Sequence, residues 1–357
     1  MTTSSRAPAL PLPLPIFCPI EPRIHPQAKD IEERSIEWLA GYDYFVGPGG
    51  RERLLGTNSA EFAARVTPDA LTERLQMASD WDYLGFAFDD AFCDSGPMST
   101  DPARFMRHAN RIIRMLEAPR DTPATDHDPY MTALADISAR FAACVTPTQH
   151  RRWVLAHRAW LFGVAAQIST AATPGLDDYL TIRVNNAAGE VVTATGELAA
   201  GDEVPAHEMD LPAVRALTEM CRVLAALDND LHSYRKTTSQ HESNQQNLVT
   251  VLATEQGRGL GPAANAAVGI RDRIMCRFLI LREQLTATPG MGAPARAYVQ
   301  SLGHVIRGNI DWALNVPRYT VDGTTAGDTV IWTEYPADSC PSAPPLPSIA
   351  WWWDRDL

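Results

Sequence analysis

Residues 212–237 read PAVRALTEMCRVLAALDNDLHSYRKT, and this stretch has the pattern of one long helix. Pro212 stands where helices commonly begin, and apolar residues then recur from Val214 to Leu231. Three oxygen-bearing side chains follow at intervals of four residues: Asn229, Ser233 and Thr237. A helix turns about 100° per residue, so steps of four drift by only about 40° and align these side chains in one polar stripe. The stripe is a candidate binding face, although a solvated helix face would show the same pattern.

A second oxygen-rich segment, DDAFCD, occupies residues 89–94. On a helix Asp90 and Asp94 share one face, and Asp89 lies about 100° away. The segment ends the apolar run 81–88, where acidic groups repel one another and oppose the helix dipole, so a solvated helix end explains them poorly. Hard oxygen ligands suit Mg²⁺, which shares its coordination shell between water, protein and substrate phosphates. Two such faces across a cavity predict a site for Mg²⁺ and a diphosphate.

The helical pattern extends from about residue 27 to 320, without an internal repeat or a linker. Helices are expected to open at these positions: Asp30, Thr67-Pro68, Asp101-Pro102, Thr146-Pro147, Pro212, Asn244, Ala263 and Pro294. The β-prone stretch Glu190–Thr195 is short and lies among Gly and Ala, so we interpret it as a loop or lid. These features predict an all-α, single-domain helical bundle with mostly short connections.

The two ends of the chain differ from this helical region. Residues 1–26 hold seven prolines, which fix φ and remove amide donors, so we expect an extended arm. Residues 321–357 form an irregular tail that ends in Trp351-Trp352-Trp353. We expect these rings to pack on the domain's own surface, because exposed aromatic clusters are unfavourable; a flap or an oligomer contact is the alternative.

Composition excludes several classes of partner. The chain has 357 residues and a net charge of −12, which argues against nucleic acid or an anionic membrane surface. Its six cysteines form no CxxC pair, so zinc and thioredoxin-like chemistry are not expected. No apolar run approaches the ~20 residues of a membrane span, and the first residues lack the pattern of a signal peptide. We expect a cytoplasmic protein.

Taken together, the two oxygen-rich segments resemble those of bacterial class I terpene synthases. The family's Asp-Asp-x-x-x-Asp/Glu segment matches the acids at 89, 90 and 94. Its Asn-Asp-x-x-Ser-x-x-x-Glu segment matches Asn229, Asp230 and Ser233, but Thr237 stands where the family has Glu. A neutral hydroxyl should hold Mg²⁺ less firmly than a carboxylate. Glu242, five residues further on, is the alternative ligand, less favoured than Thr237 or a water.

Basic positions extend the resemblance over roughly residues 10 to 320. Arg183, 46 residues before Asn229, matches the family's diphosphate-sensing arginine. Lys236 occupies the place of a diphosphate-contacting lysine, and Arg318-Tyr319 matches the Arg-Tyr pair near the end of the family's domain. After Arg183 the chain departs again. Asn186 stands where Asp or Thr is frequent, and Ala187 occupies the position that donates a carbonyl.

The resemblance implies a class I terpenoid synthase fold around a central apolar cavity, a prenyl diphosphate substrate and three Mg²⁺ ions. Asp90, Arg183 and Asn229 would be catalytic, and the basic residues and Tyr319 would clamp the diphosphate. Four aromatic residues are candidates to line the cavity, although ordinary core packing is the alternative for each: Phe86, Phe88, Trp160 and Trp312. His232 points away from the polar stripe, and we expect a structural role for it.

The implied activity is that of a carbon–oxygen lyase acting on phosphates. It would ionise farnesyl or geranylgeranyl diphosphate and cyclise the cation to a sesquiterpene or diterpene, with family base rates slightly favouring C15. A chain-elongating prenyltransferase is one alternative, but the Asn/Ser/Thr segment and the acidic composition favour a cyclase. A non-catalytic helical protein with a degraded metal site, signalled by Thr237, is another. The family often forms dimers, so a homodimer is compatible with the resemblance.

Overall fold

The computed structural model describes residues 10, 12–42, 49–94, 96–118, 128–170, 172–240 and 246–357. The side chains of 94, 239 and 240 are outside this description, as are residues 241–245 and therefore Glu242. The helices have these bounds: α1 (Ala28–Ala40), α2 (Gly50–Leu55), α3 (Ser59–Val66), α4 (Thr72–Phe88), α5 (Pro102–Glu117), α6 (Pro129–Cys144), α7 (Pro147–Ser169), α8 (Leu176–Asn186), α9 (Gly189–Ala200), α10 (Ala206–Met209), α11 (Pro212–Gln240), α12 (Leu248–Gln256), α13 (Leu260–Ala287), α14 (Ala293–Asn315) and α15 (Pro347–Ala350).

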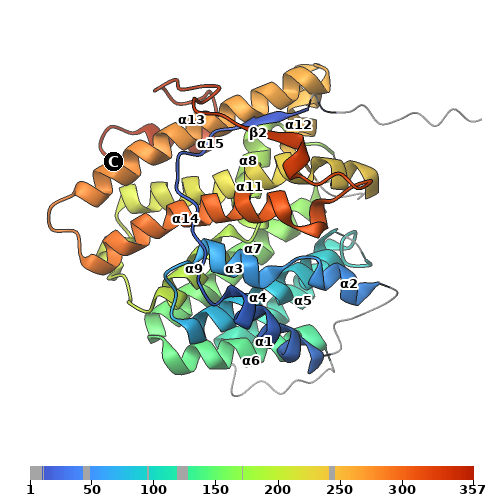
Figure 1. Cartoon of the computed structure of the whole chain (residues 1–357), viewed down its shortest axis with the longest axis vertical. Helices are drawn as coiled ribbons and strands as arrows, with labels where there is room; N and C mark the ends of the chain where they lie inside the picture. Colours follow the sequence, from blue (N-terminus) through green and yellow to red (C-terminus); the bar gives the residue numbers. More distant parts are fainter. Residues whose placement is uncertain are drawn as a thin grey trace, which may run out of the picture.

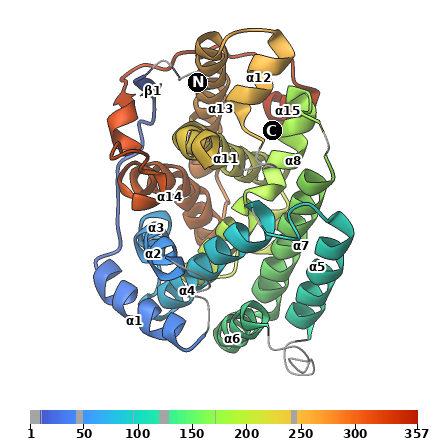
Figure 2. The ribbon, with the colours of Figure 1, turned by 90° about the vertical axis from the view of Figure 1, so that its right-hand side faces the viewer.

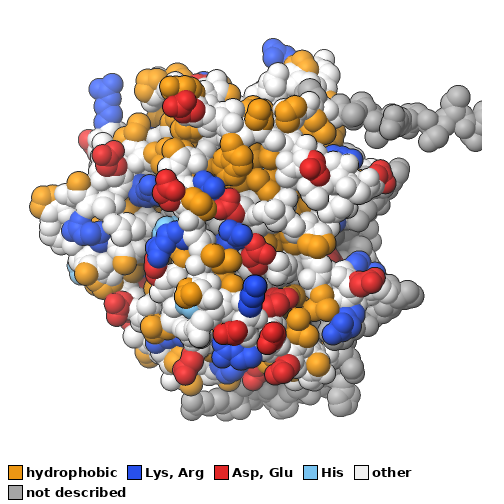
Figure 3. All heavy atoms as spheres, in the orientation of Figure 1, with side chains coloured by type: hydrophobic (Ala, Val, Ile, Leu, Met, Phe, Trp, Pro, Cys, Tyr) orange, Lys and Arg blue, Asp and Glu red, His pale blue; other side chains and the backbone are white. Residues whose placement is uncertain are grey.

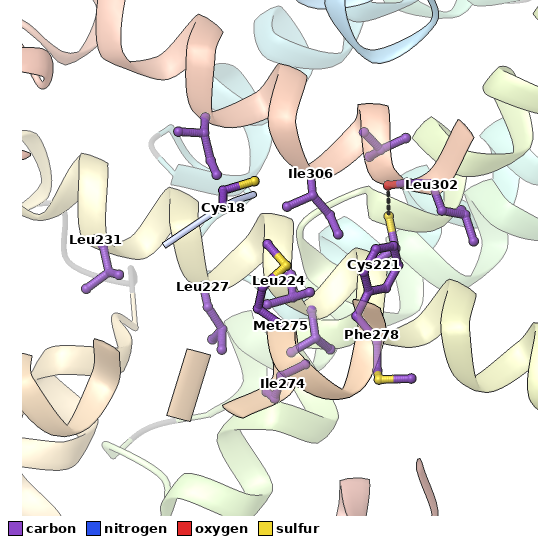
Figure 4. Close-up of a cluster of buried hydrophobic side chains, with 14 of the residues drawn as sticks. Cys18, Cys221, Leu224, Leu227, Leu231, Ile274, Met275, Phe278, Leu302 and Ile306 are labelled. Carbon is purple, nitrogen blue, oxygen red and sulfur yellow. Dashed lines mark hydrogen bonds between the residues drawn. The ribbon is translucent and has the colours of Figure 1, made fainter. Parts of the chain in front are cut away.

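Helix α11, the stretch quoted first, lies inside the bundle (Figures 1 and 2). It contacts α14, α13, α12, α8 and α9, while α4, α6, α7 and α5 pack together in the other half. Figure 4 shows the core where α11, α13 and α14 meet, with the thiol of Cys221 donating to the carbonyl of Leu302. The predicted all-α class is confirmed.

Several expected helix starts are confirmed, among them Pro212, and two of them have side-chain caps. Asp101 caps α5 by accepting a hydrogen bond from the amide of Arg104 at 2.9 Å. Thr146 and Gln149 form a capping box at the start of α7. The expected start at Thr67-Pro68 is wrong, because α4 begins at Thr72. The hydroxyl of Thr67 instead donates to the carbonyl of Ala63, at the end of α3.

The interpretation of Glu190–Thr195 as a loop or lid is also wrong, because this stretch lies within helix α9. Val191, Thr195 and Leu198 recur at helical spacing and are buried, and Thr195 accepts a hydrogen bond from the indole of Trp153 on α7. Packing against α7 and α4 therefore overrides the local preference for a strand. The helix expected from Asn244 is α12, which begins at Leu248; residue 244 lies outside the described residues.

The N-terminal arm and the C-terminal tail meet on the outside of the bundle. Strand β1 (Leu14–Ile16) of the N-terminal arm pairs in parallel with β2 (Val330–Trp332) of the tail, with Leu14 opposite Val330. Further along the tail, a 3₁₀ turn spans Trp351–Trp353, and Trp352 is fully buried. The guanidinium of Arg277 donates to the carbonyl of Trp352 at 2.7 Å. The expected packing of the tryptophans on the domain's own surface is confirmed.

The surface carries charged side chains of both signs. On the face drawn in Figure 3, acidic and basic side chains intermingle rather than gathering by sign. None of the described helices is both long enough and apolar enough to span a bilayer.

Candidate active site

A cavity of about 170 Å³ opens between α3, α4, α7, α8, α9, α11 and α14. Aromatic rings form much of its wall: Phe62, Trp81, Phe86, Trp160 and Trp312. Polar side chains from four distant parts of the sequence also line it: Asp89, Arg183, Asn229, Ser233, Lys236, Arg318 and Tyr319. The cavity thus joins an apolar wall to a polar region that contains both oxygen-rich segments.

The first oxygen-rich segment forms a π-helical turn, Asp89–Asp94, which continues directly from α4. Such turns are wider than an α-helix and are frequent at functional sites. Asp89 faces the cavity, and Asp90 accepts two hydrogen bonds from Arg318, of 2.7 and 3.0 Å. Burial alone would raise the pKa of Asp90, but the charges of Arg318 and Lys236 lower it below its ordinary value. The carboxylate therefore stays ionised.

The second segment projects from α11. The amide oxygen of Asn229 accepts from Arg183 at 3.0 Å, and its nitrogen donates to the hydroxyl of Tyr319 at 2.8 Å. The hydroxyl of Ser233 lines the cavity and has no hydrogen-bond partner among the described residues. Thr237 is buried but is not among the residues that line the cavity; Lys236 lines it instead. The cavity face of α11 thus runs through 229, 233 and 236.

Arg183, in the last turn of α8, connects several elements. It donates to Asn229, to Asn186 at 3.1 Å and to the carbonyl of Ala226 at 3.2 Å, and it forms an ion pair with Asp230 at 2.9 Å. Burial would lower the pKa of Arg183, but Asp230 raises it above its ordinary value. The guanidinium is therefore charged and held by acceptors on its own helix and on α11.

Asp230 is the anchor of this arrangement. It accepts from the hydroxyl of Tyr179 on α8 and from the amide of Leu248 at 3.1 Å, where α12 begins. Asn247 adds a hydrogen bond from its amide to the carbonyl of Asp230 at 2.7 Å. In the sequence Asp230 matches the Asp of the family's Asn-Asp-x-x-Ser segment, without a structural role assigned to it. Its role in joining α8, α11 and α12 depends on Tyr179 and Leu248, which no local pattern singles out.

Arg318 and Tyr319 lie in a 3₁₀ turn, Pro317–Tyr319, which follows α14. The backbone amide of Arg318 donates to the carbonyl of Gly56 at 3.1 Å, so the turn is held against the end of α2. The guanidinium also lies 5.0 Å from the ring centroid of Phe86. Arg318 therefore stands between the first acidic segment and the aromatic wall.

Of the four aromatic residues expected to line the cavity, three do so and one does not. Phe86 and Trp312 line the cavity and stack with centroids 5.3 Å apart, and Trp160 lines it from α7. Phe88 does not line this cavity; it faces a smaller neighbouring pocket, with its ring 5.3 Å from that of Trp160. A two-residue step on a helix turns the side chain by about 200°, so Phe86 and Phe88 face opposite sides.

Several residues of the cavity were not singled out from the sequence. Phe62, Trp81, Asp82, Gly85 and Gln246 all line it. The signal for Asp82 and Gly85 was available, because they lie seven and four residues before Asp89 and so share its helix face. Phe62 comes from α3, and no periodicity connects that helix to the site.

Two expected placements concern Ala187 and His232. Ala187 caps the C-terminus of α8 and lines the cavity beside Arg183. His232 is buried outside the cavity lining, and burial lowers its pKa to about 4, so its ring is neutral at neutral pH. The placement of His232 fits the structural role expected for it.

The donor set suits a hard divalent cation. The carboxylates of Asp89 and Asp90 lie on the π-helical turn after α4. The amide oxygen of Asn229 and the hydroxyl of Ser233 lie on α11. The unpartnered hydroxyl of Ser233 is the observation that favours a further ligand there. No cluster of three His, Cys, Asp or Glu side chains occurs among the described residues, so a cation would need ligands from both segments or from a substrate.

Comparisons with known proteins agree with this geometry. The profile of the family described as terpene synthase family 2, C-terminal metal binding, matches residues 80–276. Spiroviolene synthase of Streptomyces violens is 44% identical over 352 residues, 96% of this chain and 97% of that protein. Phomopsene synthase of Allokutzneria albata is 36% identical and covers 99% and 100% of the two chains. The crystal structure of an ancestral reconstruction, the SVS_A2 protein, superposes with a TM-score of 0.85 at 45% identity, over 97% and 99% of the chains.

Proposed function

The chain belongs to the bacterial class I terpene synthases, and from this we propose that it is an Mg²⁺-dependent cyclase of farnesyl or geranylgeranyl diphosphate. It would release diphosphate and cyclise the resulting carbocation to a sesquiterpene or a diterpene. The observation that carries the proposal is the single cavity in which an aromatic wall meets both oxygen-rich segments, Arg183, Lys236 and Arg318.

The basic residues would bind the diphosphate by exchanging partners. In the structure Arg318 is bound to Asp90, and Arg183 to Asn229 and Asp230. A diphosphate offers stronger, charge-assisted acceptors, so each guanidinium can turn toward it while the carboxylates become available to cations. When bound, Mg²⁺ neutralises charge on the leaving diphosphate and acts as a Lewis acid on its oxygens.

The aromatic wall would guide the cation. Ring faces stabilise a nearby positive charge by on the order of 1–2 kcal/mol each when water is excluded. Phe86, Trp160 and Trp312 are placed to do so, with Phe62 and Trp81 completing the wall. No protein nucleophile is required, because the π bonds of the substrate attack the cation, and a water-free cavity protects it from premature capture.

The test is to incubate the protein with Mg²⁺ and either diphosphate and to identify products by mass spectrometry. We expect a cyclic hydrocarbon or alcohol from one chain length, and none after Asp90→Asn, which retains an acceptor for Arg318 but loses the charge. A third reaction adds isopentenyl diphosphate. A longer linear diphosphate there would favour the chain-elongating alternative, and no product from any mixture would favour a non-catalytic protein.

A further inference from the structure

Asp82 is an unpaired carboxyl in the wall of the cavity. It lies on α4, it is 6% exposed, and it makes no hydrogen bond or ion pair with any residue that the structure describes. Asp80, on the same helix and fully buried, provides a contrast. It accepts from Ser35 at 2.7 Å and from Arg140 at 2.8 Å. Buried carboxyls that serve the fold are paired in this way, and Asp82 is not.

The position of Asp82 separates it from the diphosphate region. Asp82, Phe86 and Asp89 follow the spacing i, i+4, i+7, so they lie on one face of the helix. At about 1.5 Å per residue, Asp82 lies roughly 10 Å along the axis from Asp89. It therefore faces the aromatic part of the cavity, where the hydrocarbon of a prenyl substrate would lie.

None of the described basic side chains that line the cavity forms an ion pair with Asp82. Arg222 also lines this region, but its guanidinium donates to the hydroxyl of Thr193 at 3.1 Å and pairs with Glu190 at 3.4 Å. Burial, with no opposing charge, raises the pKa of Asp82 well above its ordinary value. Burial therefore favours the neutral carboxylic acid over the carboxylate. The neutral acid carries the proton that an alkene could accept, whereas an ionised carboxylate has none to give.

Other protic groups in the cavity wall are much weaker acids or are held in ion pairs. The indole of Trp81, the amide of Asn309 and the phenol of Tyr319 each lose a proton far less readily than a carboxylic acid. Asp230 is bound to Arg183, and Asp89 belongs to the metal-binding segment. Asp82 is thus the group best suited to proton transfer with hydrocarbon.

We propose that Asp82 is a catalytic residue that exchanges a proton with a neutral cyclised alkene inside the cavity, a role that rests on the proposed cyclase function. The alkene arises when a first cyclic cation loses a proton to the released diphosphate. The O–H bond of Asp82 then breaks, and the π pair of the alkene forms a C–H bond, which leaves a cation beside the carboxylate. The carboxylate later removes a proton from a carbon next to the positive charge. That C–H pair becomes a new double bond, and the acid is restored.

The experiment is turnover in D₂O by the parent and by Asp82→Asn, which has the same shape but no acidic proton. We expect the parent's product to gain one deuterium. The variant should still release diphosphate, but the amount of its final product should fall at least about 100-fold. An alkene that has gained no deuterium, with the molecular mass of the unlabelled product, should accumulate instead. Glu73→Gln, which removes an exposed carboxyl from the same helix, should behave as the parent.

Asp82→Leu tests whether the loss of product in the Asn variant could come from a loss of stability. Because the carboxyl has no partner to lose, the melting temperature should be equal to the parent's or higher. An unlabelled product from the parent overturns the proposal, and so does an unchanged product from the Asn or Leu variant. These results would leave the cyclase function intact, because diphosphate and hydrocarbon would still form. A parent that forms no product with either substrate would instead remove both proposals.

Discussion

Asp90 and Arg318 are brought together from positions 228 residues apart, and each is partly or largely shielded from water. Removing one member of such a pair leaves the other charge without compensation, which is more damaging than the pair is stabilising. Arg183 and Asp230 form a second pair of this kind, with side chains 11% and 3% exposed. The site is therefore organised around ion pairs that keep the guanidinium groups of Arg318 and Arg183 in position in the absence of substrate.

Asn229 is the residue through which the two arginine-bearing regions meet. We expect Asn229→Ala to lower kcat/KM at least about 100-fold, because it removes a candidate metal ligand together with the contacts to Arg183 and Tyr319. Steady-state kinetics with product quantification is the measurement. Asn315→Ala, on an exposed position at the end of α14, is the matched control. Normal activity of Asn229→Ala would show that the metal assignment is wrong.

Thr237 occupies the position where the family has Glu, yet it does not line the cavity. If it is the third ligand of this segment, Thr237→Glu should lower the Mg²⁺ concentration required for half-maximal activity, because a carboxylate binds Mg²⁺ more strongly than a hydroxyl. A magnesium titration of turnover measures this, with exposed Thr250→Glu as control. An unchanged dependence would count against Thr237 and favour another oxygen, such as that of the lining residue Gln246.

His157 should make stability depend on pH. Its Nε2 accepts from the indole of Trp81, and its Nδ1 lies 2.8 Å from the carbonyl of Trp153, which requires a neutral ring. Burial lowers its pKa from 6.5 to about 4, so between these values the unfolded chain binds more protons than the folded one. This contribution is present above pH 6.5 and is lost as pH falls toward about 4, by up to about 3 kcal/mol.

Urea unfolding at about pH 7 and about pH 5 tests this expectation. The loss of unfolding free energy on acidification should be smaller in His157→Gln than in the parent. The exposed His207→Gln is the control and should follow the parent. Equal losses in His157→Gln and the parent would mean that another group carries the dependence, for example His232, whose pKa is also lowered to about 4.

At the scale of elements, the close approach of α7 and α8 positions Arg183. A Cβ on Gly163 would lie 2.6 Å from the backbone nitrogen of Asn186 and from the Cβ of Asn185. The glycine is required there because no side chain fits between the helices. Asn186 accepts a hydrogen bond from Arg183, so the spacing of α7 and α8 also governs the site.

We expect Gly163→Ala to lower the free energy of unfolding by about 1–3 kcal/mol, because the two helices must separate. Turnover should fall as well, since Arg183 shifts with α8. Denaturant unfolding and product formation are the measurements. Gly259→Ala is the control, because an added Cβ there meets nothing within 4 Å. Equal stability of the two variants would show that the helices accommodate the methyl group without moving.

Elements also show where local patterns fail. The short β-prone stretch Glu190–Thr195 lies among Gly and Ala and predicts a loop or lid, yet it belongs to α9, whose buried face packs on α7 and α4. The start of α4 was misplaced because Thr67-Pro68 looks like a cap, whereas Thr67 bonds back to α3. In both cases the deciding partners are on other helices.

At the scale of the whole molecule, the N-terminal arm and the C-terminal tail pair with each other on the outside of the bundle. β1 pairs with β2, more than 300 residues away in sequence, and the tail adds the buried Trp352. Asp177 of α8 accepts from the amide and the hydroxyl of Ser348 at 2.9 and 2.6 Å. The tail therefore braces α8, which carries Arg183, as well as α13 through Arg277.

Trp352→Ala should lower the free energy of unfolding by about 3–5 kcal/mol, because it leaves a cavity under the tail. Urea denaturation is the measurement. Tyr335→Ala, which truncates a ring that is 74% exposed, should change stability by less than about 0.5 kcal/mol. A stable Trp352→Ala would indicate that the tail contributes little to the fold.

The sequence by itself determined the all-α class, most of the helices and both oxygen-rich segments. These depend on periodicity and spacing within one helix, which a linear pattern records. Tertiary structure alone decided that Phe86 rather than Phe88 faces the cavity and that Arg318 holds Asp90. It also decided that Asp82 has no partner among the residues that the structure describes. Each depends on which side chains arrive from helices far away in sequence, because burial and electrostatic pairing are properties of the assembled surroundings.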